Sequence, residues 1–179
     1  MNEFLQEAPG LYGDFKIREE VIQKIWNDQS FIQKDLKTEC GKKLTILSPG
    51  KWNRGIEGPD FFDARLILNE KNIRGDIEIH FHAKDWESHG HNIDPNFTKV
   101  VLHVTLFPNR AKDFQTRSEK NTEIPQLILL PHLFQSVEEY AEELCISKLA
   151  GREVDKEETN SKKRLVPEKV EDLARQRWN

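Results

Sequence analysis

An alternation of apolar and ionisable residues between Asp76 and His82 constrains the fold more than any other part of the sequence. Side chains of a β-strand point to opposite faces in turn, so this stretch predicts a strand whose isoleucine and phenylalanine side chains face a core. The opposite face then carries Asp76, Glu78, His80 and His82. Such a face is either solvated or, where it is covered, paired or metal-bound, because burying unpaired charge is costly.

The rest of the chain predicts an α/β (α+β) domain with a mixed sheet and flanking helices. A helix is expected over residues 14–32, with Asp14 as its N-cap, and a second helix from the capping box of Ser136 and Glu139 to a stop at Gly151. A short helix or ordered loop is expected over residues 83–98. The expected strands cover residues 43–47, 61–68, 74–82, 100–107 and 125–130, the last at a sheet edge.

The length of 179 residues suits one core domain, which we expect over residues 1–150. Residues 151–166 are nearly all charged and predict a linker, and residues 167–179 predict the start of another helix. No apolar run is long enough to span a membrane, and two distant cysteines do not indicate a disulfide framework, so a cytoplasmic protein is expected. A net charge of −4 argues against a passive nucleic-acid coat protein, but not against an enzyme with clustered carboxylates.

Asp60 follows the turn-forming pair Gly58-Pro59 and begins the strand before the one that carries Glu78. If these two strands form a hairpin, Asp60 comes near the His80 end of the second strand. Two carboxylates brought together in this way suit Mg²⁺ or Mn²⁺. Five of the six histidines lie between positions 80 and 103, which favours a shared site. The secondary or substrate-side candidates are His89, His91, His103, Asp76, His82 and Asn53.

Several short motifs occur together, in order, between residues 19 and 104. They are Glu19 to Trp26, Thr38-x-x-Gly41, Gly50-x-x-Asn53, Gly58-Pro59-Asp60-Phe61-x-x-Ala64, Gly75 to His80, Asp85-Trp86-x-x-His89-x-His91 and Leu102-His103-Val104. Their order and density resemble an uncharacterised bacterial family, domain of unknown function 2851. This resemblance implies no activity.

A looser resemblance bears on function. Pro59-Asp60 followed by Glu78-x-His80 is similar to the motif of PD-(D/E)xK nucleases, whose restriction-endonuclease-like core is a helix, a three-stranded meander, a helix and a further strand. The resemblance implies that Asp60 and Glu78 hold a divalent metal for hydrolysis of nucleic acid, and that His80 orients water or the phosphate. Glu19 or Glu20 matches the acidic helix position of some members. His80 departs from the usual lysine, which puts activity in question.

Two other interpretations remain open. Gly75, His80, His82 and Glu87, with His103 further along, approximate the metal-binding motif of cupins, which implies a β-barrel holding Fe, Mn, Ni or Zn. Alternatively, the polar strand face is a binding surface without catalysis. The nuclease-like interpretation requires Asp60 and Glu78 to converge, whereas the cupin-like one requires His80, His82 and His103 around one point.

Overall fold

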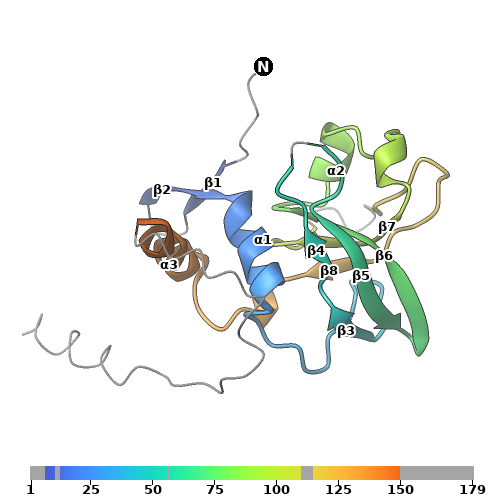
Figure 1. The fold of residues 1–179 in the computed structure, drawn as a ribbon, viewed down its shortest axis with the longest axis horizontal. Helices are drawn as coiled ribbons and strands as arrows, with labels where there is room; N and C mark the ends of the chain where they lie inside the picture. The colour runs from blue at the N-terminus through green and yellow to red at the C-terminus, as the bar shows by residue number, and fades with distance from the viewer. Residues whose placement is uncertain (1–6, 11–12, 56, 110–114, 150–179) are drawn as a thin grey trace, which may run out of the picture. The chain divides into compact units, whose positions relative to one another are not determined.

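The computed structural model describes residues 7–10, 13–55, 57–109 and 115–149 (Figure 1). The chain forms a mixed α/β structure around a curled six-stranded sheet in the order β3-β5-β6-β7-β8, with β4 paired to β5. The strands of this sheet are β3 (Leu44–Ser48), β4 (Lys51–Trp52), β5 (Phe61–Leu68), β6 (Lys71–His80), β7 (Val100–Thr105) and β8 (Gln126–Ile128). A separate two-stranded sheet pairs β1 (Glu7–Gly10) with β2 (Gly13–Arg18).

The hairpin of β5 and β6 is the longest antiparallel pairing in the sheet (Figure 1). Its bounds confirm the predicted strand over residues 61–68, whereas β6 begins three residues before the predicted start at Arg74. The extra length arises because the chain reverses in two residues: Asn69 and Glu70 both have positive φ, at 44° and 69°, as tight hairpin turns require. The hairpin register brings the start of β5 beside the end of β6.

The sheet changes from antiparallel to parallel after β6. β7 lies parallel to β6, and β8 lies parallel to β7 at the sheet edge, as predicted for residues 125–130. The crossover holds a short helix, α2 (Asp85–Ser88), and a 3₁₀ turn, η1 (Pro95–Phe97). Gly75 permits the close approach of the two strands, since a Cβ there would lie 2.6 Å from the Lys99 carbonyl oxygen.

The first helix is shorter than predicted. α1 covers Glu19–Asp28, and residues 13–18 are extended and pair with β1, so the prediction of an N-cap at Asp14 is wrong. Arg18 occupies the N-cap position without a capping hydrogen bond from its side chain. The apolar face of α1 is buried as its periodicity predicted, through Val21, Ile22, Ile25 and Trp26. These residues belong to the same core cluster as Ile77 and Ile79 of β6.

The capping box before the last described helix is confirmed. Ser136 Oγ accepts from the backbone N–H of Glu139, and a Glu139 carboxylate oxygen accepts from the backbone N–H of Ser136. The helix, α3 (Val137–Leu149), follows a 3₁₀ turn, η2 (Leu130–His132). The predicted stop at Gly151, linker and final helix lie outside the described residues. In the described part of the chain, no helix is long and apolar enough to cross a membrane.

Candidate metal centre

The polar face of β6 is covered, not solvated. Asp76, Glu78 and His80 are exposed by only 8%, 6% and 1% of their surface, while Ile77 and Ile79 on the other face are equally buried. Both faces of this strand end are therefore packed, which removes the interpretation of an ordinary solvated sheet face. Ionisable groups buried in this way need partners or a bound ion.

Asp60 and Glu78 converge at the open end of the β5–β6 hairpin. The backbone N–H of Asp60 donates to Glu78 Oε2 at 3.0 Å, and the backbone N–H of Ile79 donates to Asp60 Oδ2 at 2.9 Å. From α1, Gln23 Nε2 donates to Asp60 Oδ1 at 2.7 Å. These contacts hold both carboxylates in fixed orientations. Burial and then the nearby Glu78 raise the pKa of Asp60 well above its ordinary value.

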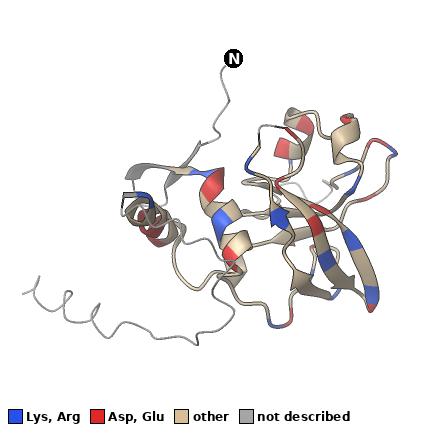
Figure 2. Ribbon diagram, viewed as in Figure 1, with Lys and Arg blue, Asp and Glu red and all other residues tan. Residues whose placement is uncertain are grey.

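Glu19 adds a third carboxylate to the cluster of Asp60 and Glu78. It lies in the first turn of α1, where the ribbon is red in Figure 2. Burial, and then the carboxylates of Asp60 and Asp85, raise the pKa of Glu19 to about 8, against a backbone hydrogen bond from Phe81. Its Oε1 is buried without a hydrogen-bond partner. Burial also raises the pKa of Glu78, with a further contribution from Glu19. Within the described ranges, no lysine or arginine is among the groups that shift these three pKa values.

The raised pKa of Glu19 predicts a pH-dependent stability of the metal-free protein. Its carboxyl titrates near 4.5 when unfolded and near 8 when folded, so the folded state binds more protons in that window and loses stability as pH rises through it. Glu19→Gln removes this loss. The quantity to compare is the free energy of unfolding of the variant minus that of the wild type. Between low pH and a pH above 8, we expect this difference to rise by about 1–3 kcal/mol, a figure reduced for partial exposure.

Urea unfolding in EDTA at several pH values measures this gain. Glu70→Gln, on the exposed hairpin turn, is the matched control and should show no such pH dependence. A constant difference between Glu19→Gln and wild type from pH 4.5 to 9 would contradict a buried, proton-binding Glu19.

A chain of imidazoles adjoins the carboxylates. His80 Nδ1 lies 2.9 Å from His103 Nε2, and His103 Nδ1 lies 2.8 Å from Thr116 Oγ1. On its other side, His80 Nε2 lies 3.0 Å from His89 Nδ1. Burial is the main cause that lowers the pKa of His80 well below its ordinary value. Burial also lowers the pKa of His103 to about 3, so both rings are neutral near pH 7.

His91 completes the group from the crossover after β6. Its ring is stacked on Phe97 at 3.8 Å between centroids and lies nearly parallel to the His80 ring. His91 Nε2 is 3.3 Å from Glu78 Oε1, and burial lowers the pKa of His91 to about 4. His80, His89 and His91 each offer a nitrogen, and these three atoms lie within 4.8 Å of one another. The triad can therefore hold a metal ion.

The remaining candidates have local partners. Asn53 bridges its own loop, donating to the carbonyl oxygens of Glu57 and Pro59. Asp76 accepts from the backbone N–H of Asp63, where β5 bulges. His82 stacks on Phe107 at 5.1 Å. The triad thus contains His80 but not His82, which does not favour the cupin-like grouping.

One family model, described as a protein of unknown function (DUF2851), matches residues 19–177. The chain belongs to this family. No curated protein and no solved structure matches the chain. For this DUF2851 member, the match begins at Glu19 and spans the carboxylate and imidazole groups described above.

Three residues that support the site in this DUF2851 chain were not predicted from the sequence. Gln23 lies one helical turn after Glu19, a spacing that could have indicated a shared face. Asp85 accepts from the backbone N–H of His82 and contributes to the raised pKa of Glu19. Thr116 belongs to a polar stretch without periodicity, and no sequence signal distinguishes it.

Proposed function

We propose that this chain is a divalent-metal-dependent phosphodiesterase of the PD-(D/E)xK type that hydrolyses nucleic acid. The observation that carries the proposal is the meeting of Glu19 from α1, Asp60 from the loop before β5 and Glu78 from β6 in one largely buried cluster. Three neighbouring carboxylates repel one another unless protons or a cation neutralise their charge. Carboxylate oxygens are the ligands that Mg²⁺ and Mn²⁺ prefer.

The order of elements supports this proposal. α1 is followed by the antiparallel strands β3, β5 and β6, then by the crossover with α2, then by β7 parallel to β6. Apart from the short strand β4, which also pairs with β5, this order is similar to that of a restriction-endonuclease-like core and so supports the proposal. On this proposal, Asp60 and Glu78 correspond to the motif's two acidic positions, and Glu19 corresponds to the acidic position on the first helix.

The residues present suit a divalent cation. Asp60 and Glu78 would hold the cation. Glu19 Oε1, which α1 brings to the cluster, is buried without a hydrogen-bond partner and could be a third ligand. When bound, such a cation lowers the pKa of a coordinated water and neutralises charge that develops on a phosphate. Gln23 and the N–H of Ile79 keep Asp60 in place. Arg54, exposed in the loop that leads to Asp60, is suited to contact a phosphate of the substrate.

A hydrolysis assay on labelled single-stranded DNA, double-stranded DNA and RNA tests the proposal. We expect cleavage of at least one substrate with Mn²⁺ or Mg²⁺, loss of cleavage in EDTA, and recovery when the metal is returned. Asp60→Asn should lower the rate by about a hundredfold or more, because it removes a ligand charge at the centre. Asp35→Asn, in an exposed loop, is the control. Metal binding without any hydrolysis would instead favour the non-catalytic binding function.

A further inference from the structure

Four donor atoms lie close together beside the carboxylate cluster. His80 Nε2 is 3.0 Å from His89 Nδ1 and 3.5 Å from Glu78 Oε1. His91 Nε2 is 3.3 Å from the same Glu78 oxygen. Glu78 therefore turns Oε2 towards Asp60 and Oε1 towards the imidazoles.

Three of the separations among these four atoms match those of neighbouring ligands around one ion. Two donors about 2.1 Å from a metal lie about 3.0 Å apart at a right angle and about 3.4 Å apart at the tetrahedral angle. The three distances of 3.0, 3.3 and 3.5 Å cover that range. Two neutral imidazoles can share only one proton between facing nitrogens, whereas a metal would satisfy both lone pairs at once.

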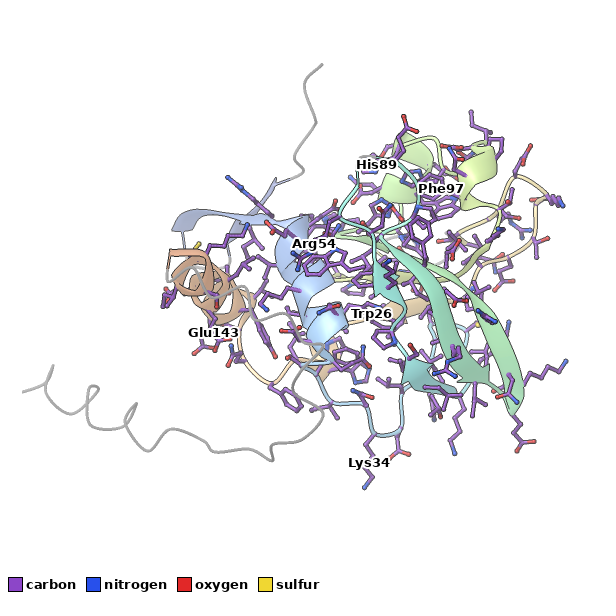
Figure 3. All side chains as sticks on the ribbon, viewed as in Figure 1. Trp26, Lys34, Arg54, His89, Phe97 and Glu143 are labelled. Atoms are coloured by element: carbon purple, nitrogen blue, oxygen red, sulfur yellow. The ribbon has the colours of Figure 1, made fainter. Side chains whose placement is uncertain are left out.

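The surroundings hold the rings in the ligand orientation. If His80 Nε2 is a ligand, its Nδ1–H donates to His103 Nε2, and His103 Nδ1–H donates to Thr116 Oγ1. A histidine ligand whose second nitrogen donates in this way is typical of metal sites. Phe97 supports the outer face of the His91 ring (His89 and Phe97 are labelled in Figure 3). His103 and Thr116 are thus positioning residues for His80.

We propose that His80, His89, His91 and Glu78 Oε1 form a transition-metal site, distinct from the oxygen-rich position at Glu19 and Asp60. Three imidazoles and one carboxylate select Zn²⁺, Fe²⁺, Mn²⁺, Co²⁺ or Ni²⁺ over Mg²⁺. Metal binding here does not depend on the proposed phosphodiesterase activity. If that activity is present, the ion supplies the fixed positive charge that neutral His80 lacks and that lysine has in PD-(D/E)xK nucleases.

Cobalt binding tests the site, because Co²⁺ with nitrogen and oxygen ligands absorbs visible light. The test is to titrate the metal-free protein with Co²⁺ and to follow the absorption, with calorimetry in parallel. One equivalent of Co²⁺ should bind and produce the absorption, and excess Mg²⁺ should not displace it. His89→Ala should weaken binding by about tenfold or more, whereas His132→Ala, on η2, should leave it unchanged.

Three outcomes overturn the proposal: no cobalt absorption in the wild type, an unchanged titration in His89→Ala, or displacement of Co²⁺ by Mg²⁺. Asp60→Asn separates this proposal from the phosphodiesterase. The variant should keep the cobalt absorption even though hydrolysis is lost. Cobalt binding without hydrolysis would overturn only the proposed function, and hydrolysis without cobalt binding would overturn only this site.

The positioning role of His103 has its own test. Thr116→Val removes the hydroxyl that is hydrogen-bonded to His103 Nδ1 while keeping the side-chain shape. We expect Co²⁺ affinity to fall by about tenfold and the absorption band to shift, with Thr116→Ser restoring both. An unchanged band in Thr116→Val, with circular dichroism confirming the fold, would contradict the positioning role.

Discussion

Glu78→Gln should lower kcat/KM for the proposed metal-dependent hydrolysis by about a thousandfold or more. Glu78 joins the carboxylates to the imidazoles, because its Oε2 accepts from the N–H of Asp60 and its Oε1 lies beside His80 and His91. Glutamine keeps the length of the side chain and an oxygen that can accept from Asp60. It removes the negative charge that a cation at either position requires.

Steady-state kinetics with saturating Mn²⁺, together with calorimetric titration of the metal, measure the effect. Glu70→Gln makes the same chemical change on an exposed turn and should keep wild-type kinetics. If Glu78→Gln retained activity within about threefold, the assignment of Glu78 to the reaction would be wrong. Circular dichroism of both variants should match that of the wild type, because no packing volume is lost.

Trp26→Ala should destabilise the fold by about 3–5 kcal/mol, the cost of removing a large aromatic side chain from a packed core. Trp26 is fully buried on α1 and is stacked on Phe31 with 5.9 Å between ring centroids. Its Nε1 donates to the carbonyl oxygen of Pro49 at 3.0 Å, which ties α1 to the turn after β3. Because α1 also carries Glu19 and Gln23, the same packing positions two side chains of the candidate metal centre.

Urea unfolding of the metal-free protein measures the loss. Trp26→Phe keeps most of the aromatic volume but removes the indole N–H and its hydrogen bond, so it should cost less than half as much. Equal losses in the two variants would show that the hydrogen bond, and not the packing, is what Trp26 contributes. Activity of the still-folded fraction of Trp26→Ala should also fall if α1 positions Glu19.

Local pattern predicted those parts of the fold in which each residue's own preference agrees with its surroundings. The strand over residues 61–68 and the capping box at Ser136 are examples, because alternation and capping act over a few neighbouring residues. The start of α1 was not predictable in this way. Residues 13–18 pair with β1, and tertiary pairing overrides a plausible N-cap at Asp14.

The candidate site likewise has residues whose meeting the sequence predicted and residues whose meeting it did not. Asp60 and Glu78 could be paired from the sequence because a hairpin register relates them directly. The clustering of histidines between residues 80 and 103 also indicated a shared site. Which histidines meet depends on a crossover whose path no periodic pattern describes, and it places His89 and His91 beside His80 while His82 stacks on Phe107.

The sequence by itself determined the family, the alternation of β6, and the residue types that can bind a metal, since these are properties of short stretches of chain. Only the tertiary structure decided that the polar face of β6 is covered, that Glu19 and Gln23 reach it from α1, and that Thr116 ends the imidazole chain. Burial and long-range hydrogen bonds join residues far apart in sequence, and no local preference encodes their meeting.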